Sequence, residues 1–102
     1  MSEVAMIANA QEALKLASQT LGIPQDDLLV QGLRRYLQSQ LHEVQAAIFQ
    51  IVGQYNAPDV AALEDRYREG SLDEASSWHD LQKLDHLEYK RDRLQHLLES
   101  LP

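Results

Sequence analysis

The sequence predicts an all-α protein built around an antiparallel hairpin of two long helices. Apolar residues recur at steps of three, four or seven residues in two separate stretches, as they do in helices that pack along a common seam. The first seam is Leu37, Leu41, Val44, Ile48, Ile51 and Tyr55, and the second is Leu84, Leu87, Leu94 and Leu98. No stretch shows strand-like alternation, and the chain has only three prolines and four glycines to interrupt its helices.

The first half of the chain predicts two helices joined by a tight turn. An N-terminal helix is expected over about residues 3–21, because apolar residues recur there on one side. Gly22 is expected to end it, since glycine readily adopts the left-handed conformation found at helix C-termini. The second helix is expected over about residues 25–55, with Asn56 and Pro58 as its end signal.

The second half predicts a short helix followed by a long one. The short connecting helix is expected over about residues 59–69, and Gly70 should end it. The last helix is expected over about residues 77–100. A connection of this length lets the last helix return antiparallel to the second helix.

A chain of 102 residues is of a size for a single domain, here residues 1–102. In this domain the helix pair of residues 1–37 is expected to continue into the hairpin of residues 37–102. Two helices alone leave much of each seam uncovered. We therefore expect a homodimer in which four-helix packing buries the rest. The residues assigned to self-association are those of the two seams, Leu37, Leu41, Val44, Ile48, Ile51, Tyr55, Leu84, Leu87, Leu94 and Leu98.

Two residues near the second seam stand out. Arg91 lies between Leu87 and Leu94, where its charge would fix the register, contact an acid of a partner, or extend its head group to water. Trp78 is expected either to cover the core beneath the connecting segment or to anchor a partner protein.

Charge and composition restrict the function. The net charge is −7, and eleven acids face six bases in residues 56–102, which disfavours nucleic-acid binding and favours a basic partner. The absence of cysteine excludes disulfides, thiolate metal ligands and cysteine nucleophiles. No apolar run reaches the roughly 18 residues of a membrane span, and no basic N-terminal signal appears, so we expect a cytoplasmic protein without membrane contact.

The polar residues show no catalytic pattern. His79, His86 and His96 lie among acids and bases of the last helix, and neither a Glu-x-x-His nor a His-x-x-x-His pair occurs. Charges at three- and four-residue spacing are typical of a solvated helix surface. We therefore expect no enzyme activity and assign no catalytic, cofactor or metal residue, with a metal- or ligand-binding helical bundle as a remote alternative.

The segment from Leu14 to Leu37 contains, in order, Leu16-Ala17, Leu21-Gly22-Ile23, Asp27-Leu28-Leu29 and Leu33-Arg34-Arg35-Tyr36-Leu37. It resembles the helix pair of ribbon-helix-helix repressors, many of which are antitoxins of bacterial toxin–antitoxin modules. The family's DNA-reading strand has no counterpart here, because residues 1–7 contain no base and do not alternate. None of its DNA-contacting residues is therefore carried over.

The resemblance and the acidic second half together imply a non-enzymatic, antitoxin-like regulatory protein. It would bind a partner protein, such as a toxin, through its acidic helical half. The alternative is a ribbon-helix-helix-like DNA-binding regulator, in which Arg34 and Arg35 would contact phosphates.

Overall fold

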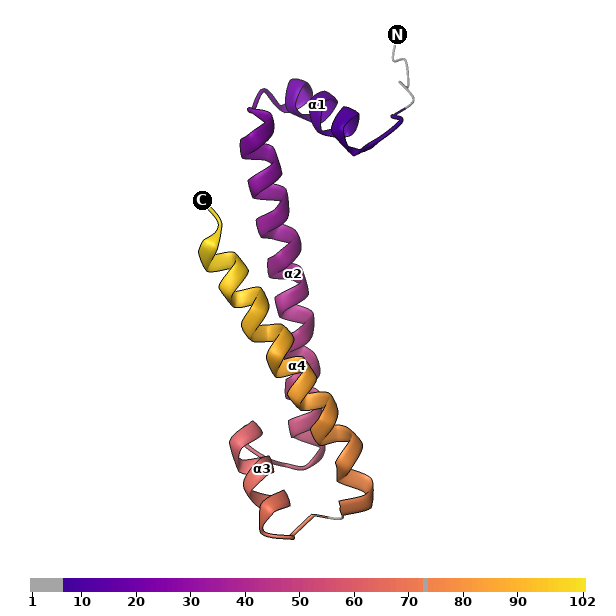
Figure 1. Cartoon of the computed structure of the whole chain (residues 1–102), viewed down its shortest axis with the longest axis vertical. Helices are drawn as coiled ribbons and strands as arrows, with labels where there is room; N and C mark the ends of the chain where they lie inside the picture. Colours follow the sequence, from indigo (N-terminus) through magenta and orange to yellow (C-terminus); the bar gives the residue numbers. More distant parts are fainter. Residues whose placement is uncertain (1–6, 73) are drawn as a thin grey trace.

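The computed structural model describes residues 7–72 and 74–102. In this part of the chain it contains four α-helices and no strand (Figure 1). In chain order they are α1 (Ala10–Leu21), α2 (Gln25–Gln54), α3 (Val60–Arg68) and α4 (Glu74–Ser100). The prediction of an all-α fold is confirmed.

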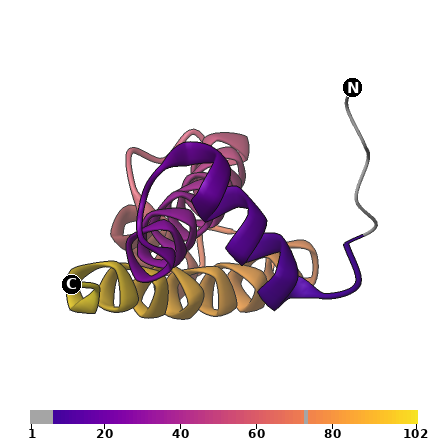
Figure 2. The ribbon, with the colours of Figure 1, turned by 90° about the horizontal axis from the view of Figure 1, so that it is seen from above.

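The long helices α2 and α4 pack against each other as the predicted hairpin, α1 packs on α2 alone, and α3 packs on both long helices. Figure 1 shows α1 at one end of the molecule and α3 at the other, and Figure 2, seen from above, shows α1 in front of the hairpin. The molecule measures 67 × 28 × 19 Å and its radius of gyration is 20.7 Å, against about 13 Å for a compact chain of 100 residues. None of the described helices combines the length and apolarity needed to cross a membrane.

The core lies along the α2–α4 contact and contains most of both predicted seams. Its buried apolar side chains are Val44, Ile48, Ile51, Val52, Leu63, Leu84 and Leu94. Leu37, Leu41, Tyr55 and Leu87 pack against these side chains while partly exposed. Most seam side chains thus pack within one chain, some of them only partly buried, and their assignment to self-association stays a prediction.

Helix α1 begins later than the sequence pattern indicated. Its first residue is Ala10, and Ile7 to Asn9 precede it without helical structure, while residues 3–6 lie outside the described residues. The Asn9 side chain accepts a hydrogen bond from the Glu12 N–H at 2.9 Å. The Glu12 carboxylate accepts one from the Ala8 N–H at 3.3 Å. These two hydrogen bonds set the start of the helix, because they pair the Glu12 N–H of the first turn and fix the residue before the cap.

The ends of α1 and α2 follow the same geometry. Gly22 has φ 69°, and the N–H groups of Gly22 and Ile23 both donate to the Ser18 carbonyl. At the end of α2, Asn56 has φ 53° and its N–H donates to the Gly53 carbonyl, while the Ala57 N–H donates to that of Val52. Both are left-handed helix ends that pair otherwise unsatisfied carbonyls. The predicted ends at Gly22 and near residue 55 are confirmed.

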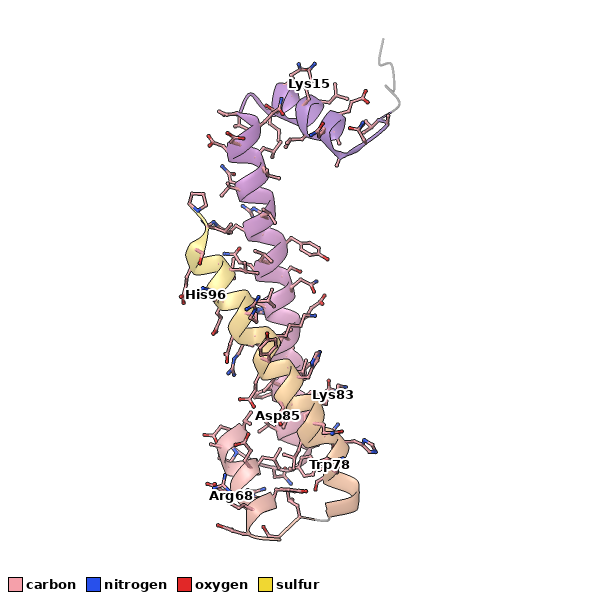
Figure 3. The ribbon with its side chains drawn as sticks, in the orientation of Figure 1. Lys15, Arg68, Trp78, Lys83, Asp85 and His96 are labelled. Atoms are coloured by element: carbon pink, nitrogen blue, oxygen red, sulfur yellow. The ribbon has the colours of Figure 1, made fainter. Side chains whose placement is uncertain are left out.

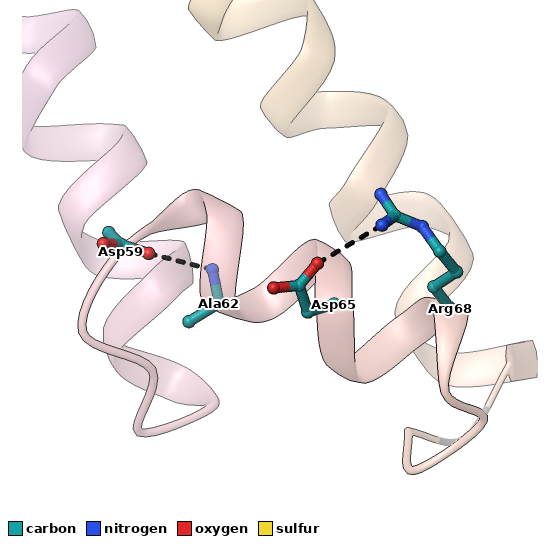
Figure 4. A network of polar contacts seen from close by, with 4 residues as sticks. All are labelled: Asp59, Ala62, Asp65 and Arg68. Atoms are coloured by element: carbon teal, nitrogen blue, oxygen red, sulfur yellow. Dashed lines mark hydrogen bonds and ion pairs between the residues drawn. The ribbon is translucent and has the colours of Figure 1, made fainter.

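The segment between the long helices carries its own caps. The Asp59 carboxylate accepts from the Ala62 N–H at 2.8 Å and starts α3 (Figure 4). The Arg68–Asp65 ion pair in the same view joins side chains that are mostly exposed, so it contributes little to stability. Helix α4 begins at Glu74 rather than near Ser77, which is buried inside the helix and so does not mark its start.

Tyr55 ties the end of α2 to α4. Its hydroxyl donates a hydrogen bond to the Asp80 carboxylate, and the Arg66 guanidinium of α3 donates to the Tyr55 carbonyl. The hydrogen bond to Asp80, with burial and the carboxylate's charge as lesser causes, raises the pKa of Tyr55 to about 12. These contacts fasten three helices together at the closed end of the hairpin.

Candidate protein-interaction surface

Three carboxylates from two helices converge beside the closed end of the hairpin. Glu64 lies on α3, and Asp85 and Glu88 lie one turn apart on α4. One oxygen of each lies within 4.8 Å of the others, with Asp85 exposed and the other two partly buried. Figure 3 shows Asp85 above Trp78 on α4. Oxygen ligands of this kind suit Mg²⁺ or Ca²⁺, and they equally suit the guanidinium of an incoming arginine.

The surroundings of Glu88 disfavour the ionised form of its carboxyl group. Burial raises the pKa of this carboxyl, the negative charge of Glu64 raises it further, and Arg91 opposes both. The Arg91 guanidinium lies 3.8 Å from Glu88 and 3.1 Å from Asp92. Arg91 is thus a partly exposed side chain at the margin of the seam, and the acids it pairs with belong to its own helix, α4.

Two open hollows lie on either side of these carboxylates. One, of about 630 Å³, is lined by Phe49 and Val52 of α2, Val60 of α3 and Glu88 of α4, among others. The other, of about 500 Å³, is lined by side chains of α3 and α4, including Glu64, Tyr67, Trp78, Leu81 and Asp85. We call this region the acidic face and define it by its carboxylates and its two exposed aromatic residues, Phe49, Glu64, Trp78, Asp85 and Glu88.

The aromatic residues of the acidic face remain accessible. Trp78 is 50% exposed and Phe49 is 80% exposed. Trp78, named in the sequence analysis as a core cover or a partner anchor, thus borders a hollow instead of being buried. The sequence did not single out Glu64, because its closeness to Asp85 and Glu88 depends on how α3 folds onto α4. The only sequence signal was the Asp85–Glu88 spacing within one helix.

The two arginines of the DNA-binding alternative, Arg34 and Arg35, both lie on α2 but have different neighbours. The Arg34 guanidinium donates to the main-chain oxygen of Pro102 at 2.9 Å. Arg35 lines a different hollow with His42 and Glu43. Phosphate binding by these arginines stays a prediction, which salt-dependent binding to duplex DNA would test.

Replacing Glu88 with glutamine should stabilise the protein at neutral pH by about 0.5 kcal/mol, because it removes a partly buried charge that also repels Glu64. The folded state raises the pKa of Glu88, so the cost of ionising it is present at neutral pH and is relieved as pH falls through the raised pKa. The advantage of Glu88→Gln should therefore shrink in acid. Thermal unfolding from pH 7 to pH 4 measures this.

Asp92→Asn is the control, since Asp92 pairs with Arg91 at 3.1 Å and raises the pKa of Glu88 less than burial and Glu64 do. It should give no stabilisation. Equal melting temperatures for Glu88→Gln and the original chain at pH 7 would contradict a net cost of ionising Glu88 in the folded state.

The model of a family described as the Uncharacterized protein MJ0235 family matches residues 4–102, which include all four helices. No curated protein matches the chain. No solved structure matches it either.

Proposed function

The chain belongs to the MJ0235 family, and we propose that it is a non-enzymatic interaction protein that binds a basic partner protein, in the manner of a small antitoxin. The observation that carries this proposal is the acidic face. Two large aromatic side chains stand exposed there beside hollows, and three converging carboxylates lie between them.

The aromatic residues supply the apolar part of the proposed contact. Exposed Phe49 and Trp78 bury large areas when a partner covers them, and such residues dominate the energy of many interfaces. Each borders a hollow that admits an apolar side chain of the partner. This combination favours a folded protein or a helical segment as the ligand.

The carboxylates supply the polar part and specify the charge of the partner. Three carboxylates lie within 4.8 Å of one another here, and burial together with the charge of Glu64 raises the pKa of Glu88 although Arg91 opposes both. An arginine or lysine of the partner would relieve this repulsion and form charge-assisted hydrogen bonds. Residues 38–102 carry twelve acids and six bases, so the same half of the chain attracts a basic protein over longer range.

A binding experiment tests the proposal directly. The full chain is immobilised, exposed to extract of its native host, and the retained proteins are identified and then purified. The reading frame beside its gene supplies the first candidate, and the proposal expects a cytoplasmic partner with a basic surface. Trp78→Ala and Phe49→Ala should each weaken binding of the purified partner at least tenfold, and rising salt should weaken it further.

Tyr89→Ala is the control, because Tyr89 is an exposed aromatic residue of α4 that lines neither hollow of the acidic face. It should leave affinity within about twofold. A purified partner that binds Trp78→Ala and Phe49→Ala as tightly as the original chain would refute the proposed surface. Steeply salt-dependent binding to duplex DNA would instead favour the regulator alternative.

A further inference from the structure

Helix α1 is poorly supported by its own chain. None of its 12 residues is buried, and α2 is the only helix against which it packs in the described structure. Helices of this length are marginal in water unless an apolar face is covered. We call α1 and the first part of α2, residues 7–37, the elbow; Figure 1 shows it at the end opposite α3.

The elbow contains an apolar groove of about 700 Å³ between α1 and α2. No charged residue is among those that line it, and its large apolar side chains are Leu14, Leu28, Leu29, Leu33 and Tyr36. Three of its large side chains remain open to solvent, since Leu29 is 50%, Leu33 44% and Tyr36 64% exposed. A groove without charge and with this much apolar exposure is typical of an association surface.

Gly32 adds an independent observation. It lies inside α2, where glycine costs about 1 kcal/mol relative to alanine. A Cβ at this position would meet nothing within 4 Å, so packing within the chain does not require glycine. A glycine among the residues that line the groove does allow another backbone to approach closely.

We propose that the elbow of a second copy of this chain occupies the groove. Residues 7–37 carry three acids and three bases, whereas residues 38–102 carry twelve acids and six bases. Two neutral elbows can meet about a two-fold axis without net repulsion, while contact between two hairpin halves opposes a net negative charge on each. The arrangement also leaves both acidic faces free at the far ends, so it does not depend on the proposed function.

The test is the mass of the full chain in solution, measured by sedimentation velocity from about 1 to 100 μM. The expected species has twice the 11.6 kDa mass of one chain. Leu33→Glu should raise the dimer dissociation constant at least tenfold while circular dichroism shows unchanged helicity, because Leu33 is already 44% exposed in one chain. Gly32→Leu should weaken the dimer without lowering helicity, since open space surrounds its Cβ position.

Two controls separate the elbow from other surfaces. Phe49→Glu changes a more exposed apolar residue of the acidic face and should leave the dimer intact while abolishing partner binding. Gly53→Leu changes the other glycine inside α2, which is equally unhindered, and should also leave the dimer intact. A chain that stays monomeric at 100 μM, or dissociates as readily with Phe49→Glu as with Leu33→Glu, would overturn the proposal.

Discussion

Replacing Leu84 with alanine should destabilise the protein by about 3 kcal/mol, a large part of the total for a domain of this size. Leu84 is 1% exposed and belongs to the core that joins α4 to α2. Few other contacts stabilise the elongated molecule, because this core runs mainly along the α2–α4 contact and only Leu63 of α3 adds to it among the buried side chains described. Thermal unfolding at one protein concentration should show a drop of more than 10 °C, at about 4–8 °C per kcal/mol.

Leu97→Ala provides a matched control on the same helix. Leu97 is 49% exposed, so the same truncation should cost less than about 1 kcal/mol. Equal drops in melting temperature for the two variants would contradict the packing of α2 on α4. A fully helical Leu84→Ala variant with unchanged stability would do the same.

The hairpin was predictable because its signal is periodic and extends along two long helices. Val44, Ile48, Ile51 and Leu84 recur at helical spacing and must be buried somewhere. The glycine stop at Gly22 was equally clear, since it depends on local backbone chemistry. Periodicity does not reveal whether an apolar face packs within one chain or between two. The seams pack largely within one chain, whereas the elbow is proposed to pack between two.

Several features were not predicted from the sequence. One depends on competing signals for the start of a helix, and others depend on tertiary folding. The start of α1 depends on Asn9 and Glu12, whose three-residue spacing is a capping signal that the apolar pattern farther upstream obscured. The carboxylate cluster requires Glu64 to fold onto α4, and no pattern along the chain specifies that contact. The acidic half of the chain was visible in the composition, and Trp78 was named as a possible partner anchor, but the exposure of Phe49 beside a hollow that Glu88 also lines was not foreseen.

Replacing Tyr55 with phenylalanine should destabilise the protein by about 1.5 kcal/mol at neutral pH, because it removes a hydrogen bond to a charged acceptor, Asp80. The predicted seam assigned Tyr55 to self-association, whereas its hydroxyl links the two long helices of one chain. The value is at the lower end for such bonds because Tyr55 is only partly buried. Chemical denaturation of both chains at pH 7 measures the difference.

The pH dependence identifies this hydrogen bond as the cause. The folded state raises the pKa of Tyr55 from 10.0 to about 12, so the stability it contributes is complete below pH 10 and is lost as pH rises toward 12. The original chain should therefore lose its advantage over Tyr55→Phe in that interval. A titration followed by tyrosinate absorbance should show a component near pH 12 in the original chain, and this component should be absent from Tyr55→Phe. Tyr36→Phe, at an exposed tyrosine, should preserve both the stability and that component. A constant stability difference from pH 9 to pH 12 would show that the Tyr55 ring, and not its hydroxyl, holds the helices together.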